Sequence, residues 1–136
     1  MRLSVLVAMM AVASCGASVA NVDVDCGSTS EQPFITYDAT GRDCVWDAYT
    51  RGRTVKWVAT WRTMEGDPIT RTLFVTSKEI QASLDNREDK YGGQDRGVVT
   101  WRCSTIAKHP ISGGDGSRYD FYLSGCTGPN ASTTFP

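Results

Sequence analysis

The chain has 136 residues, of which 40% are hydrophobic and 21% are charged, and its formal net charge at pH 7 is −1. This length predicts one domain rather than two. Basic and acidic residues are interspersed, without a run of Lys or Arg. The charge pattern therefore argues against nucleic acid as a partner.

The N-terminal residues have the pattern of an export signal. Arg2 precedes an apolar run from Leu3 to Met10, and Val12-Ala13-Ser14-Cys15 follows. These four residues resemble a bacterial lipobox. We therefore predict a lipoprotein signal peptide over residues 1–14 and a lipid, palmitate or a similar acyl chain, on Cys15. The mature protein would be anchored to a membrane of the cell envelope, with residues 15–25 as a short, polar tether.

A second cleavage site competes with the first. Ser18-Val19-Ala20 is a small-x-small pattern before Asn21, and cleavage there would release a secreted protein without a lipid. Both alternatives place the mature chain outside the cytoplasm. A membrane-spanning helix is not expected, because the apolar run is shorter than the ~20 residues that a bilayer requires.

The other cysteines predict two disulfides. The chain has five cysteines, and lipidation of Cys15 would leave an even number, which in an exported protein indicates a disulfide framework. These four can pair in three ways. We favour Cys26 with Cys44 and Cys103 with Cys126, because each pair encloses a local unit, and the second would join neighbouring strands. Zinc is disfavoured because no Cys-x-x-Cys pair occurs, and no motif predicts a metal or a cofactor.

The first element predicted after Cys26 is a helix from Gly41 to Arg51. Thr40 stands where a helix cap is expected, and Gly52 follows the last turn, where glycine often ends a helix. The apolar positions recur at helical spacing. They are Cys44, Val45, Ala48 and Tyr49.

From Thr54 the apolar period changes to two, which predicts a half-buried strand through Arg62. Met64 to Pro68 has turn residues, and Ile69 to Val75 predicts a returning strand. Arg71 interrupts the apolar face of that strand. We therefore expect a bulge or an inward ion pair at this position.

Further strands are predicted at Ile80 to Leu84, Val98 to Ser104 and Tyr119 to Ser124. A charged loop, Asp85 to Gly97, lies between the first two. Pro129 to Pro136 has the composition of a frayed tail.

These elements predict an α+β fold, with one N-terminal helix packed on an antiparallel meander sheet of about five strands and two disulfides. The single domain would span residues 26–126 and be followed by a flexible tail, 127–136. One face of the sheet would pack on the helix and the other would face water.

Two central motifs carry a resemblance to a known group of proteins. The first is the turn Glu65-Gly66-Asp67-Pro68-Ile69, and the second is Asp85-x-x-x-Asp89-x-Tyr91-Gly92-Gly93. With Cys103 and a later Ser124-Gly125-Cys126, they resemble an uncharacterised bacterial family of small secreted proteins and lipoproteins, a domain of unknown function. The resemblance covers roughly Cys26 to Cys126. It implies an exported one-domain protein, and it implies no activity and no catalytic or binding residues.

Acidic side chains provide the candidate binding residues. Glu65 and Asp67 at a hairpin tip could hold a cation or meet a basic partner, although turn chemistry explains the same residues. The charged loop adds Asp85 and Asp89 and is rich in the oxygen ligands that calcium takes. Its spacing is poor, because Arg87 and Lys90 occupy positions where an EF-hand loop has a ligand and glycine.

No catalytic residue is predicted. His109 is the sole histidine, and a Gly-x-Ser-x-Gly nucleophile turn is absent from the sequence. The four tryptophans are expected mainly in the core. They are Trp46, Trp57, Trp61 and Trp101.

The sequence thus favours a non-enzymatic binding or envelope module that recognises an unknown extracytoplasmic protein or ligand. One alternative is a secreted protease inhibitor that presents a rigid loop, residues 85–97 or 107–118. The other is a calcium-dependent protein or a carboxylate-based hydrolase. This second alternative requires the four acidic candidates to converge in space.

Overall fold

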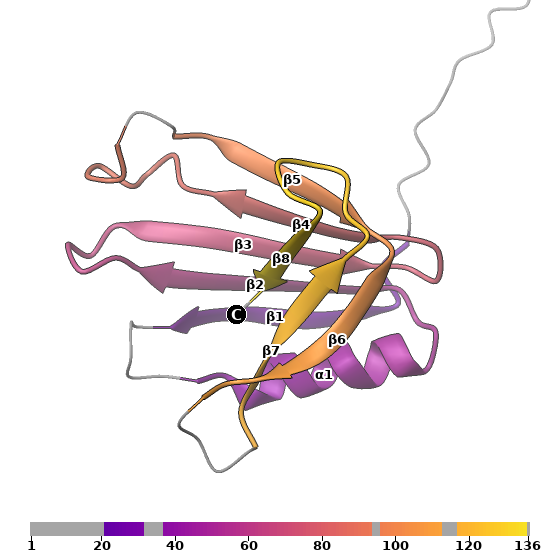
Figure 1. Ribbon diagram of the computed structural model, residues 1–136. Coiled ribbons are helices and arrows are strands. Elements are labelled where there is room, and N and C mark those ends of the chain that lie inside the picture. The colour runs from indigo at the N-terminus through magenta and orange to yellow at the C-terminus, as the bar shows by residue number, and fades with distance from the viewer. Residues whose placement is uncertain (1–20, 32–36, 94–95, 113–116, 136) are drawn as a thin grey trace, which may run out of the picture.

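The computed structural model describes residues 21–31, 37–93, 96–112 and 117–135. They form one helix and two sheets (Figure 1). Sheet A has the strand order β1-β2-β3-β4-β5, and sheet B has the order β6-β7-β8. The elements are β1 (Val24–Glu31), α1 (Ala39–Thr50), β2 (Val55–Arg62), β3 (Pro68–Val75), β4 (Ile80–Asp85), β5 (Val98–Cys103), β6 (Thr105–Pro110), β7 (Tyr119–Ser124) and β8 (Ser132–Phe135).

Sheet A is mixed, whereas the sequence predicted an antiparallel sheet. β2 to β5 form four strands of the expected antiparallel meander, but β1 pairs with β2 in parallel. The predicted last strand of the meander, β7, belongs to sheet B. Parallel neighbours need a crossover connection, and α1 provides it. The predicted N-terminal position of the helix is therefore wrong, because β1 precedes it.

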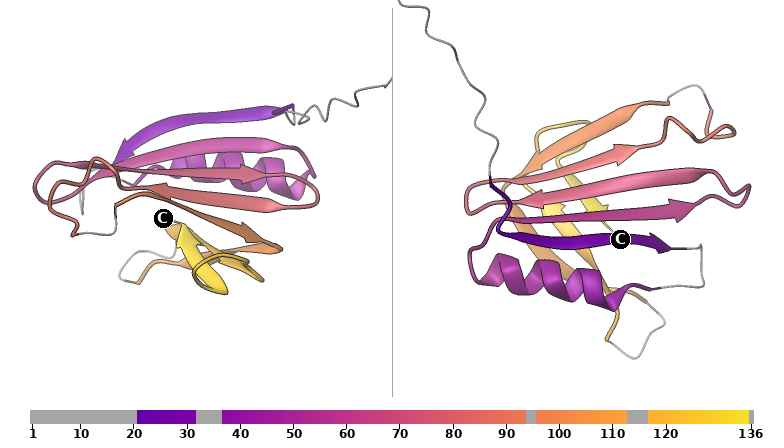
Figure 2. Two further views of the ribbon diagram at one scale, coloured as in Figure 1. Left: turned by 90° about the horizontal axis from the view of Figure 1, so that it is seen from above. Right: turned by 180° about the vertical axis from the view of Figure 1, so that it is seen from behind.

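Both α1 and sheet B cover the same face of sheet A, which we call the inner face (Figure 2). Trp57 on β2 links these layers. Its ring lies 6.4 Å from that of Phe121 on β7 and 5.5 Å from that of Phe135 on β8. The alternation predicted from the sequence is confirmed along β2 to β4. The buried inner-face residues there are Val55, Trp57, Ala59, Leu73, Val75, Ile80 and Ala82.

The helix begins at Ala39, earlier than predicted, because Asp38 rather than Thr40 is its cap. The Asp38 carboxylate accepts a hydrogen bond from the backbone N–H of Gly41. A side chain on Gly41 would collide with this carboxylate and with the Trp57 indole. The absence of a side chain at Gly41 therefore lets the first turn approach the sheet closely.

Three strands occur where the sequence predicted none. β1 begins within the predicted tether, β6 lies directly after β5, and β8 lies in the predicted flexible tail. β8 is held by pairing with β7 and by Phe135, which is 2% exposed. Each strand has few apolar residues, so the period of two on which the predictions depended is absent. Residues 1–20, with Cys15 and both cleavage sites, lie outside the described residues.

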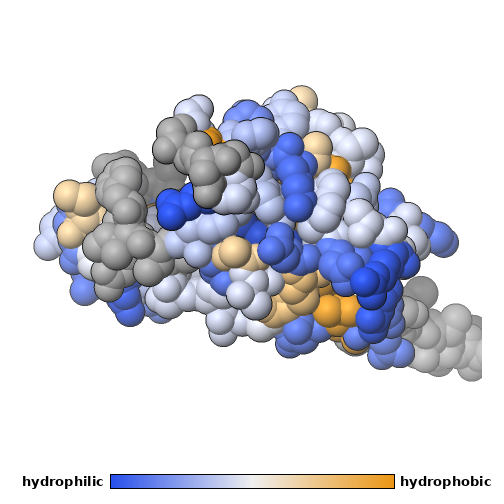
Figure 3. All heavy atoms as spheres, turned by 90° about the horizontal axis from the view of Figure 1, so that it is seen from below, coloured by the Kyte–Doolittle hydropathy of each residue, from blue (hydrophilic) through white to orange (hydrophobic). Residues whose placement is uncertain are grey.

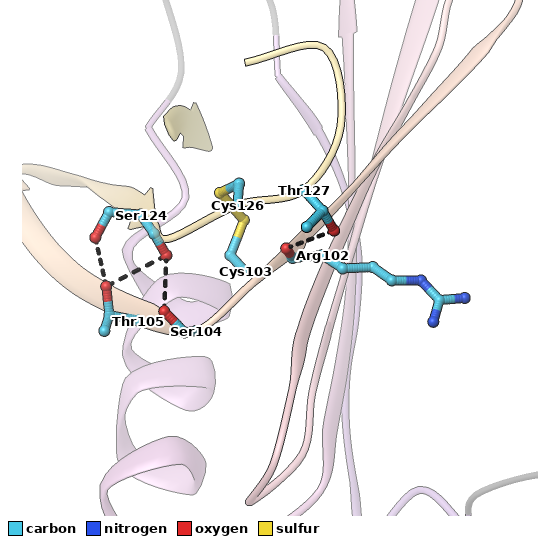
Figure 4. The surroundings of a disulfide bond; sticks show 7 residues. All are labelled: Arg102, Cys103, Ser104, Thr105, Ser124, Cys126 and Thr127. Atoms are coloured by element: carbon cyan, nitrogen blue, oxygen red, sulfur yellow. Dashed lines mark hydrogen bonds between the residues drawn. A yellow bond between two sulfur atoms is a disulfide. The ribbon is translucent and has the colours of Figure 1, made fainter. Parts of the chain in front are cut away.

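Both predicted disulfides are present. Cys26–Cys44 joins β1 to α1, and Cys103–Cys126 joins the end of β5 to the segment after β7. The second bridge therefore links the two sheets and not neighbouring strands of one sheet. Beside it, Arg102 and Thr127 exchange two backbone hydrogen bonds, and the Thr127 hydroxyl also donates to the Arg102 carbonyl (Figure 4). Ser104 is the only residue between β5 and β6, so this corner sets how sheet B crosses the inner face.

Arg71 faces inward without a bulge, because the register of β2 and β3 is continuous. Its guanidinium lies 4.2 Å from the centre of the Trp61 ring and donates to the carbonyl of Thr134 on β8. Burial lowers the pKa of Arg71 to about 10, and this effect outweighs the negative charge of Asp120, which raises the pKa. The basic residue in an apolar row thus ties β3 to sheet B.

Candidate functional site

The strongest candidate site is at one end of sheet A, where two connections meet. They are the hairpin tip between β2 and β3, residues 63–67, and the first part of the connection between β4 and β5, residues 86–93. We call them the loop pair. The described chain begins at the opposite end of the sheet, where the N–H of Val24 donates to the carbonyl of Thr54 just before β2 (Figures 1 and 2).

The hairpin tip is closed by its own backbone. The N–H of Thr63 donates to the carbonyl of Asp67 at 2.9 Å, and the N–H of Gly66 donates to the carbonyl of Thr63 at 3.0 Å. Gly66 has a φ of 92°, a conformation that glycine adopts without strain. The predicted turn is therefore confirmed.

Asp67 connects the two members of the loop pair. Its side chain is buried, with the residue 7% exposed, and its Oδ2 accepts the backbone N–H of Lys90 at 2.8 Å. The Lys90 ammonium is 3.8 Å from the other carboxylate oxygen. A buried carboxylate is costly unless it is hydrogen-bonded, so this contact explains how Asp67 is accommodated and fixes the hairpin tip against the second loop.

Asp89 likewise uses a buried carboxylate to hold the backbone of the second loop. It is 8% exposed, and its Oδ1 accepts the N–H of Tyr91 at 3.1 Å. Gly92 lies so close to this carboxylate that a Cβ atom would collide with it. Asn86 closes the base of the connection through two hydrogen bonds with Gly97. Polar side chains therefore determine the backbone path of this loop.

Two large apolar side chains extend from these braced loops into solvent. Met64 is 84% exposed and Tyr91 is 73% exposed, the largest values for such side chains among the described residues. Both stand in segments that the sequence marks as a turn or a motif, but neither is predicted from the sequence as a binding residue. The available signal was an apolar residue in each of two otherwise polar connections.

A groove of about 430 Å³ adjoins the loop pair on the outer face of sheet A. It is lined by Pro68, Thr70, Asp85, Arg87 and Glu88. Arg87 donates to both carboxylate oxygens of Asp85, at 2.9 and 2.6 Å. These hydrogen bonds lower the pKa of Asp85 to about 2, so this carboxylate is ionised at neutral pH and its charge is matched by Arg87.

The four acidic candidates do not form one centre. Asp67 and Asp89 hold backbone N–H groups, Asp85 pairs with Arg87, and Glu65 is exposed at the hairpin tip. Within the described ranges, no group of three or more His, Cys, Asp or Glu side chains is arranged to hold a metal ion. Asp95 lies outside those ranges.

The remaining sequence candidates lie elsewhere. His109 is exposed on β6, with its ring 6.3 Å from that of Tyr122. Trp57 is fully buried, whereas the other three tryptophans are partly buried. The second predicted inhibitor loop, 107–118, is partly strand β6, and residues 113–116 are outside the described part.

The chain matches no protein-family model, no curated protein and no solved structure. The resemblance to small bacterial lipoproteins and secreted proteins therefore stays a prediction. In the part of the chain that the structure describes, no helix is long and apolar enough to cross a membrane.

Proposed function

We propose that the protein is an exported, lipid-anchored binding module that contacts an extracytoplasmic protein through the loop pair, without catalysing a reaction. The supporting observation is the bracing of this surface by two buried carboxylates, Asp67 and Asp89. A loop whose conformation is fixed before binding loses less conformational freedom on binding. Binding surfaces are commonly formed by loops on a rigid scaffold.

The position of the loop pair is consistent with anchoring. The proposed lipid on Cys15 precedes Asn21, which lies at the end of sheet A remote from the loop pair. An anchor at this end leaves the loop pair free to meet a partner.

Three of the four acidic candidates already have hydrogen-bond or ion-pair partners, which counts against the hydrolase and calcium alternatives. Asp67 and Asp89 already accept hydrogen bonds from backbone N–H groups, and Asp85 is paired with Arg87. A general base or a calcium ligand would require these oxygens for the substrate or the ion. The inhibitor alternative is weaker for a related reason. An extended, substrate-like segment needs free backbone groups, whereas the N–H of Tyr91 is bonded to Asp89.

The anchor is tested by intact-mass spectrometry of the mature protein from membrane and medium fractions of a bacterial host. We expect a membrane form that begins at acylated Cys15 and gains four hydrogens when its two disulfides are reduced. Cys15→Ser should remove the protein from the membrane fraction, and Ser14→Ala is the matched control. A soluble wild-type form that begins at Asn21 would refute the anchor.

The binding role is tested separately by photo-crosslinking in host cells. A photoreactive residue replaces Glu88 in the groove, Thr100 on the outer face of sheet A or Ala107 on sheet B, all of them exposed positions. We expect a discrete protein adduct from position 88 and none from position 107. The absence of an adduct at all three positions would count against a binding module.

A further inference from the structure

The loop pair has two large apolar side chains, Met64 and Tyr91, that are mostly exposed to solvent. We infer that Met64 and Tyr91 are anchors that enter apolar pockets of a partner protein, an inference that rests on the proposed binding role. Both lie on polar loops and are mostly exposed, at 84% and 73%. In the view of Figure 3, apolar residues form only small patches. A few exposed aromatic and apolar residues typically contribute most of the binding energy of an interface.

The backbone beneath each anchor is held in place. Met64 follows Thr63, whose N–H and carbonyl are both hydrogen-bonded across the hairpin tip. Tyr91 and its neighbour Lys90 donate their N–H groups to Asp89 and Asp67. Because Asp67 belongs to the hairpin tip, the same carboxylate also fixes the distance between the two loops. The two anchors are therefore carried by loops whose backbones are fixed and joined to each other.

The charges around the anchors indicate the class of partner. Glu65 and Glu88 accompany Arg87 and Lys90, and all four are exposed. An anionic membrane or a nucleic acid would be attracted by a surface of one positive sign. Apolar anchors inside a rim of both signs match the anatomy of a protein interface.

The anchors are tested by crosslinking from Glu65, the exposed residue next to Met64. The full-length protein with a photoreactive residue at position 65 is expressed in host cells, alone and with Met64→Ser and Tyr91→Ser combined. Tyr122→Ser is the matched control, because Tyr122 is also exposed, at 40%, and lies on sheet B. Backbone amide hydrogen exchange of β2 and β3 checks that each variant is folded.

We expect one discrete protein adduct, reduced at least tenfold by the double anchor variant and unchanged by Tyr122→Ser. No adduct, an adduct with lipid, an adduct of twice the chain's mass, or an adduct that persists in the anchor variant would each overturn the inference. If an adduct from position 88 or 100 is still formed when Met64→Ser and Tyr91→Ser are combined, the protein binds a partner but these two residues are not its anchors. If no position gives an adduct, the binding role falls as well.

Discussion

Two regions of the molecule are each held by a tie across 23 residues. At the corner between the sheets, the tie is the covalent bond Cys103–Cys126. In the loop pair, it is a hydrogen bond from the N–H of Lys90 to the Asp67 carboxylate. The first tie joins two layers of the core, whereas the second joins two surface connections. The covalent tie therefore serves the fold, and the hydrogen bond serves the shape of one surface.

The largest loss of stability is expected when the disulfide at the corner between the sheets is removed. Replacing Cys103 and Cys126 together by Ala should lower the free energy of unfolding by about 3 kcal/mol, because the unfolded chain regains the freedom of a long loop. Denaturant unfolding under oxidising conditions measures this. Replacing Cys26 and Cys44 together is the matched control, with a similar loss expected from a bridge that spans 18 residues. If removing Cys103–Cys126 lowered the free energy of unfolding by less than about 1 kcal/mol, this disulfide would not stabilise the fold more than the hydrogen bond of the loop pair does.

Gly125 tests how tightly the same corner is packed, with the disulfide left intact. It has a φ of 63°, and a side chain there would collide with the hydroxyl of Ser104. Gly125→Ala should therefore cost about 2 kcal/mol in thermal or denaturant unfolding. Adding Ser104→Gly removes the collision but not the unfavourable φ, so the double variant should recover only part of the loss. Full recovery or none would contradict this explanation.

A smaller loss of stability is expected in the loop pair. Asp67→Ala removes the acceptor of the Lys90 N–H and should lower the free energy of unfolding by about 1.5 kcal/mol, the lower end of the usual range for a hydrogen bond to a charged group. The two sheets should stay intact, as judged by circular dichroism. Glu65→Ala, in the same hairpin tip, should change stability by less than about 0.5 kcal/mol. Equal losses from both variants would show that Asp67 is not a tie.

The smallest effect concerns the exposed pair of Asp85 and Arg87. Hydrogen bonds from Arg87 lower the pKa of Asp85 from about 4 to about 2. The pair therefore contributes its full stability above about pH 4. This contribution is lost as the pH falls through the folded pKa. An NMR titration of the Asp85 carboxyl carbon should have its midpoint near 2, and in Arg87→Gln near 4. A midpoint near 4 in the wild type would mean that the pair is not formed.

The parts of the fold that the sequence predicts are those with a clear local pattern. β2, β3 and β4 alternate apolar and polar residues, and the turns between them have glycine or small polar residues. β8 has the sequence Ser-Thr-Thr-Phe, and β6 ends in Lys108-His109-Pro110. Their apolar residues are too few for a period, so pairing with β7 decides their conformation.

The candidate site was predictable in composition but not in arrangement. The acidic residues of both loops are evident in the sequence, and turn chemistry correctly explains Gly66. It does not explain the Asp67 carboxylate, which bonds the distant Lys90 N–H and not the local backbone. The contact of Asp67 with Lys90 depends on how two connections meet after the sheet has formed, and no local pattern encodes it. The same contact joins the two loops that carry Met64 and Tyr91, so the sequence alone does not predict these residues as binding residues.

The measurement that tests the central claim most directly is amide hydrogen exchange at Lys90, followed by NMR in the wild type and in Asp67→Ala. If a buried carboxylate braces the loop pair, the Lys90 N–H should exchange at least tenfold more slowly than an unprotected amide, and this protection should vanish in Asp67→Ala while the amides of β3 keep theirs. Exchange of the wild-type Lys90 N–H at the rate of an unstructured peptide would contradict the account.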